Sequence, residues 1–244
     1  MSAVAMSAVP AGHQVLPDAD AVARAAAERL VAVASARQGR LGICLSGGST
    51  PKLLYRLLAG PEFREALPWE RLHWFFGDER IGDGPEAGSN RRLAEEAFGD
   101  LVPGGHLHPI PTDRTPQACA EAYAAELVSW YGADQLDPAR PLFDLVLLGL
   151  GEDGHTASLF PGKPEAQETE AWVVAVPEAG LAPFVPRVSL TLPALEATPL
   201  ALFLATGAGK RAPLARLAAG EDLPAGRVRA RGETVWLLDA GAAG

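Results

Sequence analysis

One histidine in the sequence has surroundings that suit proton transfer. His155 follows Gly154 and lies two residues after Asp153, just beyond the apolar run of residues 143–148. An imidazole exchanges protons near neutral pH, and a neighbouring carboxylate can fix which ring nitrogen carries the proton. A histidine taken at random is more often a packing or surface residue. The position of this one after an apolar strand predicts a functional role.

A second segment with chemical potential is a turn rich in glycine and hydroxyl groups. Its residues are, in order, Ser46, Gly47, Gly48, Ser49, Thr50 and Pro51. The two glycines let successive N–H groups face one point, and the helix that Pro51 opens directs its positive dipole end there. No lysine stands in the Walker pattern, so a nucleotide P-loop is excluded. From this segment alone, an anion site and an ordinary capped turn are both open.

Charged groups follow a further apolar run. Residues 78–80 (Asp-Glu-Arg) come directly after residues 72–76, and residues 89–90 (Ser-Asn) return one loop later. Arg187 and Lys210 are isolated cations at strand borders. Individually, each cation is most often a surface charge. Together with the Gly-Gly-Ser-Thr turn they could neutralise a phosphate monoester, which arginine binds bidentately and lysine binds as a point charge.

Two other motifs invite interpretations that we reject. Glycines 149, 151 and 154 match the dinucleotide pattern G-x-G-x-x-G, but that fold needs a full helix there, and residues 161–162 (Pro-Gly) interrupt the segment. His106 and His108 have metal-ligand types and spacing, yet no acidic or thiol partner stands nearby in the sequence. We expect loop histidines, no metal site and no cofactor.

The periodicity of the chain predicts elements that bring these turns together. Helices are expected from Asp18 or Asp20 to Gly39, from Pro51 to Gly60, from Asn90 with Ser89 as its N-cap, and over residues 116–131. Apolar strands are expected at residues 41–45, 72–76, 143–148, 172–176, 188–192, 200–205 and 234–238. This alternation indicates an α/β fold with a mostly parallel sheet and helices on both faces. Ligands then bind at the carboxyl ends of the strands.

Composition narrows the class of protein. The chain has 244 residues, a net charge of -9 and two cysteines, which argues against a nucleic-acid partner and a disulfide framework. No apolar run is long enough to span a membrane, and no basic segment opens the chain, so we expect a cytoplasmic protein. Residues 1–16 are expected to form a flexible tail and residues 17–244 a single α/β domain, monomeric or weakly self-associating.

Taken together, the motifs resemble the 6-phosphogluconolactonases. The segments that carry the resemblance are residues 46–51, 78–80 with 89–90, 151–161, 187–193 and 207–210. The resemblance implies a doubly wound α/β fold and the hydrolysis of 6-phosphogluconolactone to 6-phosphogluconate in the oxidative pentose phosphate pathway. It implies a catalytic group around the general acid and base His155, formed with Asp153, Arg80 and Asp78. It implies that substrate and phosphate are bound by Ser46, Gly47, Gly48, Ser49, Thr50, Asn90, Arg187 and Lys210.

Glucosamine-6-phosphate deaminases, which combine deamination with aldose–ketose isomerisation, are the close alternative. They share the phosphate turn and the Asp-Gly-His core, but typically have tyrosine where this chain has Arg80. They also have a glutamate, absent here, shortly after the histidine. A non-catalytic sugar-phosphate sensor is a third reading, although residues 1–40 offer few basic groups for DNA. Two features depart from the lactonase pattern: Glu86 stands where histidine is common, and no lysine precedes Arg187 in residues 181–186.

Overall fold

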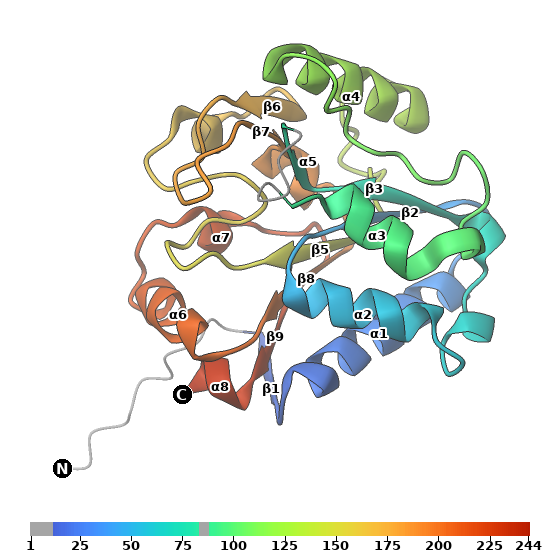
Figure 1. Cartoon of the computed structure of the whole chain (residues 1–244), viewed down its shortest axis with the longest axis horizontal. Helices are drawn as coiled ribbons and strands as arrows, with labels where there is room; N and C mark the ends of the chain where they lie inside the picture. Colours follow the sequence, from blue (N-terminus) through green and yellow to red (C-terminus); the bar gives the residue numbers. More distant parts are fainter. Residues whose placement is uncertain (1–11, 83–87) are drawn as a thin grey trace.

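The main sheet has six parallel strands in the order β1-β9-β8-β5-β2-β3 (Figure 1). The computed structural model describes residues 12–82 and 88–244. The strands of this sheet are β1 (His13–Leu16), β2 (Leu41–Leu45), β3 (Leu72–Phe76), β5 (Leu145–Gly149), β8 (Leu200–Ala205) and β9 (Glu233–Asp239). Side chains on β2, β5 and β8 are almost wholly buried, as expected for parallel strands with both faces covered.

Helices begin where the sequence supplies N-caps. The side chains of Asp18, Ser89 and Thr115 accept hydrogen bonds from the first turns of α1, α3 and α4, and each cap satisfies a backbone N–H that has no partner within its helix. The α-helices are α1 (Ala19–Ala36), α2 (Ser49–Ala59), α3 (Asn90–Phe98), α4 (Pro116–Tyr131), α5 (Leu192–Glu196), α6 (Arg211–Ala218), α7 (Pro224–Arg227) and α8 (Ala240–Ala243). The 3₁₀ helices are η1 (Arg64–Ala66), η2 (Trp69–Arg71), η3 (Gly99–Leu101), η4 (Pro164–Gln167) and η5 (Ala208–Lys210).

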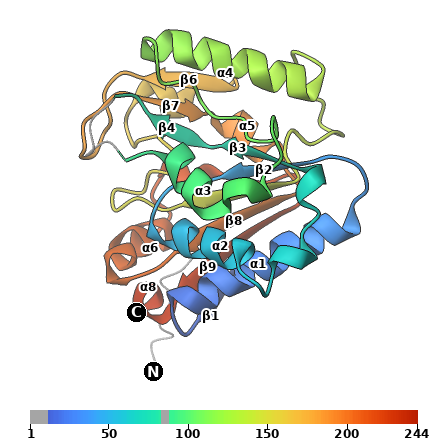
Figure 2. The same cartoon turned by 45° about the vertical axis from the view of Figure 1, so that its right-hand side comes forward.

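The helices lie on both faces of the sheet, as the sequence predicts. Connections between parallel strands are right-handed, and the chain changes its direction across the sheet after β3, so α1 and α2 lie on one face and α4 on the other. Figures 1 and 2 show α1, α2 and α3 side by side, with α4 on the opposite side of the molecule. None of the helices among the described residues combines the length and hydropathy needed to cross a membrane.

A second, antiparallel sheet was not foreseen. The strands predicted at residues 172–176 and 188–192 exist as β6 (Val173–Val176) and β7 (Arg187–Leu190), but they pair with β4 (Asp78–Arg80) instead of joining the main sheet. Gly77 links the two sheets, because its N–H donates to Leu45 of β2 and its carbonyl accepts from Leu190 of β7. Strand periodicity identifies strands and leaves their partners open.

The prediction of a flexible tail is wrong for residues 13–16. These residues form β1, an edge strand whose four positions pair in parallel with Trp236 to Asp239 of β9. Most of the side chains of β1 are exposed, so the strand has no apolar alternation for a sequence analysis to detect. Its backbone hydrogen bonds to β9 hold it in place. The rest of the expected tail, residues 1–11, lies outside the described residues.

The chain reverses its winding between β2 and β5, which are neighbours in the sheet although three α-helices and two strands separate them in sequence. Such a switch point leaves a crevice at the carboxyl ends of the two strands. The turn of residues 46–50 follows β2, and the turn that contains His155 follows β5. The topology therefore delivers both chemically suggestive turns to one place.

Candidate active site

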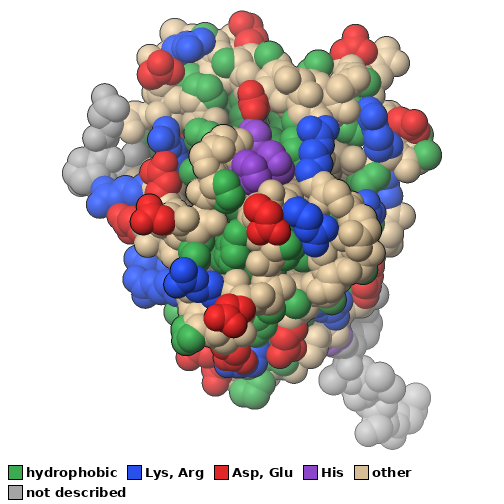
Figure 3. All heavy atoms as spheres, turned by 90° about the vertical axis from the view of Figure 1, so that its right-hand side faces the viewer, with side chains coloured by type: hydrophobic (Ala, Val, Ile, Leu, Met, Phe, Trp, Pro, Cys, Tyr) green, Lys and Arg blue, Asp and Glu red, His purple; other side chains and the backbone are tan. Residues whose placement is uncertain are grey.

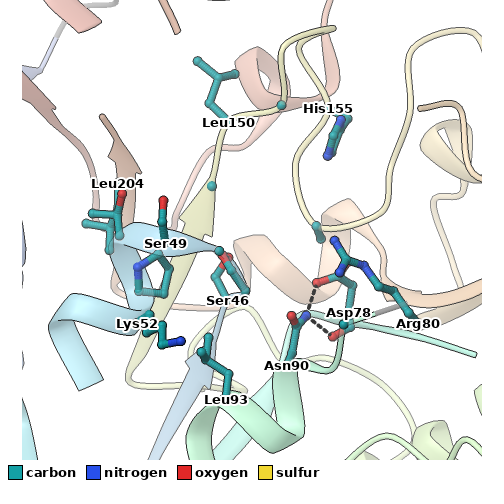
Figure 4. Close-up of a pocket in the computed structure, with 18 of the residues that line it drawn as sticks. Ser46, Ser49, Lys52, Asp78, Arg80, Asn90, Leu93, Leu150, His155 and Leu204 are labelled. Carbon is teal, nitrogen blue, oxygen red and sulfur yellow. Dashed lines mark hydrogen bonds between the residues drawn. The ribbon is translucent and has the colours of Figure 1, made fainter. Parts of the chain in front are cut away.

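A cavity of about 560 Å³ opens at this switch point. Its walls come from the turn after β2, from β4, from the N-terminus of α3, from the turn after β5 and from η5. Figure 4 shows His155 on one side, Ser49 and Lys52 on the opposite side, and Asp78, Arg80 and Asn90 grouped below His155. Of the residues predicted for the site, the lining includes Ser46, Gly47, Gly48, Ser49, Thr50, Asp78, Arg80, Asn90, His155, Arg187 and Lys210.

Asp153 lies behind the imidazole rather than in the cavity wall. Its Oδ1 is 2.6 Å from His155 Nδ1 and also accepts the backbone N–H of His155 at 3.0 Å. A carboxylate at Nδ1 keeps the proton of the neutral ring on that nitrogen, which leaves Nε2 as the acceptor. The ring of His155 points into the cavity (Figure 4). An imidazole held in this way can accept a proton at Nε2.

The charge of Asp153 is secured by the same contacts. Burial alone would raise the pKa of its carboxyl group, but hydrogen bonds and attraction from His155 outweigh that effect. The net pKa of Asp153 is below its ordinary value. The carboxylate is therefore ionised throughout the neutral range in which an imidazole titrates, and it can stabilise a protonated ring.

Two glycines make this turn sterically feasible. A Cβ at Gly151 would lie 2.0 Å from His155 Nδ1, so any side chain there would displace the imidazole. Gly154 has a φ of +94°, and a Cβ there would lie 2.6 Å from Leu223 Cδ1. Residues 150–161 contain turns but no helix. The glycine pattern thus serves the histidine turn, in agreement with the rejection of a dinucleotide site.

Asp78 connects three segments of the site. Its Oδ2 accepts from Ser158 Oγ at 2.6 Å, and its Oδ1 accepts from Asn90 Nδ2 at 2.9 Å. The same amide also donates to the Asp78 carbonyl (Figure 4), while Asn90 Oδ1 lies where a Cβ of Gly47 would be. The turn after β2, strand β4 and the turn after β5 are therefore linked by hydrogen bonds and close packing.

Glu79, to which the sequence analysis gave no role, is the buried support of the α3 N-terminus. Its carboxylate accepts the backbone N–H groups of Arg80, Asn90 and Arg91 and the hydroxyl of Ser89. Burial raises the pKa of this 1% exposed side chain, and the three N–H groups oppose that shift. Nothing in the sequence distinguishes Glu79 from a solvated charge, because its partners at the start of α3 lie ten to twelve residues away.

Two arginines stand side by side on the small sheet. Arg80 of β4 and Arg187 of β7 are cross-strand partners, and both line the cavity. Arg187 is 5% exposed, its Nη2 donates to the Pro183 carbonyl at 3.2 Å, and its Nε has no hydrogen-bond partner among the described residues. Burial lowers the pKa of Arg187. Two neighbouring guanidinium groups, one with a buried free donor, favour an anion in the cavity.

A lysine that the sequence analysis missed lines the opposite side. Lys52 is on the first turns of α2, close to Ser49, and faces the cavity (Figure 4). Lys210 lines the cavity from η5, and Thr50 Oγ1 lies 2.6 Å from Thr206 Oγ1 between the two segments. The signal for Lys52 was its position three residues after Ser49, which places it on nearly the same helix face.

The comparisons with known proteins agree with this geometry. The family model described as glucosamine-6-phosphate isomerases/6-phosphogluconolactonase matches residues 17–236. A 6-phosphogluconolactonase of Synechocystis sp. is 40% identical over 214 residues, which are 84% of this chain and 85% of that protein. One from Streptomyces coelicolor is 38% identical, over 93% of this chain and 91% of that protein. The chain belongs to this family.

Solved structures of the family have the same fold. The 6-phosphogluconolactonase from Trypanosoma cruzi matches with a TM-score of 0.83 at 30% identity, over 96% of each chain. A monomeric glucosamine-6-phosphate deaminase matches with a TM-score of 0.76 at 19% identity, a likeness that concerns the fold alone. The glucosamine-6-phosphate isomerase/6-phosphogluconolactonase fold is therefore present here, and side chains must decide the chemistry.

Outside the cavity of this family member, His106 and His108, which were expected to be loop histidines, form a cluster with His73 of β3. His73 and His106 stack with centroids 4.1 Å apart, His73 Nδ1 is 2.9 Å from His108 Nε2, and His108 Nδ1 is 2.7 Å from Glu126 Oε1. Histidine side chains gather in one patch on this face (Figure 3). No group suited to a metal ion occurs in residues 12–82 or 88–244. Glu86 lies outside the described residues.

Proposed function

We propose that this protein hydrolyses 6-phospho-D-glucono-1,5-lactone to 6-phospho-D-gluconate, a step of the oxidative pentose phosphate pathway. The observation that carries the proposal is the His155–Asp153 pair facing a cavity ringed by lysine and arginine side chains. The names of relatives that are 36–40% identical over most of the chain support the same reaction.

In the proposed mechanism, water attacks the lactone carbonyl at C1 while Nε2 of neutral His155 removes its proton. Asp153 holds the Nδ1–H and stabilises the imidazolium that forms. The negative charge on the carbonyl oxygen faces Arg80 or backbone N–H groups. When the tetrahedral intermediate collapses, the bond from C1 to the ring oxygen breaks, and protonated His155 gives its proton to that oxygen. The new carboxylic acid ionises as the product forms.

The phosphate is proposed to bind at the N-terminus of α2. Residues 46–50 supply N–H and hydroxyl donors there, and Lys210 adds a charge from η5. Lys52 supplies the cation that the family places before Arg187 and that residues 181–186 lack. Arg187 contributes positive charge from the wall of the cavity that it shares with Arg80, close to the charges of Asp78 and Asp153. Binding energy from the remote phosphate then holds C1 against His155.

A direct assay tests the proposal. Glucose 6-phosphate and its dehydrogenase generate the lactone, and the protein should hydrolyse it well above the spontaneous rate, with His155→Ala as the matched control. Release of ammonia from glucosamine 6-phosphate would favour the deaminase reading. Phosphosugar binding without turnover of either compound would favour a sensor. We also propose a cytoplasmic location and no nucleic-acid partner, in line with the net charge of -9.

A further inference from the structure

The turn that carries His155 is held from behind by a side chain of α6. Arg216 Nη1 donates to the backbone carbonyl of Asp153 at 3.0 Å, across 63 residues of sequence. The guanidinium is fixed in turn by Glu221, whose two oxygens accept from Arg216 Nε at 2.8 Å and from Nη2 at 2.5 Å. The planar arginine therefore presents its remaining donor in a fixed direction, toward the catalytic turn.

The segment after α6 closes on the same turn. The backbone N–H of Ala225 donates to the Gly154 carbonyl at 3.1 Å, and Leu223 lies against Gly154 where a Cβ would stand. Residues 216–225 thus contact the backbone on both sides of the Asp153–Gly154 peptide. Within the turn, the Gly151 N–H donates to the His155 carbonyl at 2.8 Å. The hydrogen bond from Arg216 to the Asp153 carbonyl holds the turn from outside, in addition to this internal hydrogen bond.

We propose that Arg216 is a positioning residue for the reaction, acting through Asp153. By holding the Asp153 carbonyl, Arg216 fixes the backbone from which the carboxylate reaches Nδ1 of His155. A displacement of about 1 Å in a catalytic group is enough to reduce a rate about a hundredfold. This proposal rests on the proposed function for its kinetic consequence, and on the hydrogen bonds alone for its structural one.

The same helix also ties this support to the phosphate end of the cavity. Lys210 immediately precedes α6, and Arg216 lies within it. Arg211, the first residue of α6, donates to the Gly241 carbonyl at 2.7 Å and so fixes the start of the helix against α8. One short helix therefore sets the spacing between a phosphate cation and the backbone of the catalytic pair.

The chain contains a matched control. Arg227 binds both oxygens of Asp222, five residues away, at 2.6 Å each, and gives Nη1 to the Ala166 carbonyl at 3.1 Å. Arg216 and Glu221 are likewise five residues apart. The two pairs have the same chemistry and comparable exposure, 38% and 26% for the two arginine side chains. They differ in the carbonyl group to which the arginine donates, which is that of Ala166 in η4 for Arg227 and that of Asp153 in the catalytic turn for Arg216.

The kinetic test compares Arg216→Met with Arg227→Met. Arg216→Met should lower kcat roughly tenfold or more while KM changes less than about twofold, since the phosphate groups are untouched. Arg216→Lys, which keeps one donor, should recover part of the loss, and Arg227→Met should keep the kcat of the parent. Surface ion pairs add little stability, so both methionine variants should melt near the parent temperature. Equal kcat for the two methionine variants would overturn the proposal.

A second readout requires no turnover. The proton on His155 Nδ1, bound to Asp153 across 2.6 Å, should give a low-field proton resonance that His155→Ala removes. In Arg216→Met this resonance should broaden or move upfield, and in Arg227→Met it should stay. An unchanged resonance in Arg216→Met would also overturn the positioning role. A protein that failed to hydrolyse the lactone but showed this pattern would sink the proposed function and leave the positioning role standing.

Discussion

At the scale of single residues, the site is organised so that one imidazole nitrogen is committed and the other is available. Asp153 binds Nδ1 of His155, and the ring occupies space that a side chain at Gly151 would fill. Replacement of His155 by alanine should lower kcat/KM by about 10²–10⁴-fold, the range typical of lost acid–base catalysis. Steady-state kinetics on the enzymatically generated lactone measure the loss. A variant that kept the parent rate would remove His155 from the mechanism.

The two lysines of the cavity are expected to act on substrate binding, in contrast to His155, which acts on the chemical step. Lys52→Ala and Lys210→Ala should each raise KM for the phosphorylated lactone about tenfold, because each removes one charge from the proposed phosphate site. Neither change should alter hydrolysis of gluconolactone without a phosphate, which serves as the internal control. If the two lactones responded equally, the lysines would have to act at the reacting end of the substrate.

The sequence predicts those site residues that lie close to one another in a single turn of the chain. His155 with Asp153, and the hydroxyl turn of residues 46–50, are adjacent in the chain and need only a strand before them. Lys52, Glu79 and Arg216 escape notice for a geometric reason. Their importance depends on which face of an element meets the cavity or another segment of the chain, and that is decided by packing.

At the scale of elements, α3 depends on a carboxylate that it does not contain. Glu79 accepts the backbone N–H groups of Asn90 and Arg91 at the N-terminus of α3, and that of Arg80 in β4. Glu79→Gln replaces two acceptor oxygens with one acceptor and one donor, so buried N–H groups lose partners. The free energy of unfolding should fall by about 1–3 kcal/mol, the usual cost of an unsatisfied buried group. Denaturant titration measures it, with the exposed Glu95→Gln on the same helix as control.

The histidine cluster gives β3 and its neighbouring loop a defined response to acid. Burial, followed by the charges of His106, His108 and Arg40, lowers the pKa of His73 from 6.5 to about 4. Between these values the unfolded chain binds more protons than the folded one, so the free energy of unfolding should decrease as pH falls from 6.5 to about 4. His73→Gln should flatten that decrease in urea titrations at several pH values. An unchanged slope would refute the assignment to His73.

The position of a strand along the chain can be predicted from the sequence more readily than the strand with which it pairs. Apolar runs correctly located the strands that became β6 and β7, but the antiparallel sheet requires the glycine hinge at Gly77 and hydrogen bonds across more than a hundred residues. β1 is the opposite example: the structure pairs it with β9 over four positions, but its mostly exposed residues show no strand pattern in the sequence. Local periodicity reports burial, and pairing depends on the whole chain.

At the scale of the whole molecule, the protein has a net charge of -9 and the substrate is also an anion. Long-range attraction therefore contributes little to capture, and the local cations of the cavity must act over short distances. We propose that residues 17–244 form one domain, because one apolar core includes residues from α1 through α8. Heat should unfold the protein in a single transition, with fluorescence and far-UV dichroism giving the same midpoint. Two separated midpoints would contradict a single domain.

The place of β9 in the sheet has a consequence for how the protein is made. β9 follows every other strand in the described part of the chain, yet it lies between β1 and β8. While the ribosome is still producing residues before 233, β1 has no strand beside it and β8 has an open edge. Open edges of this kind recruit other chains. Completion of the sheet is therefore a late event, and nascent chains that stop short of β9 should be the aggregation-prone species in the life of this protein.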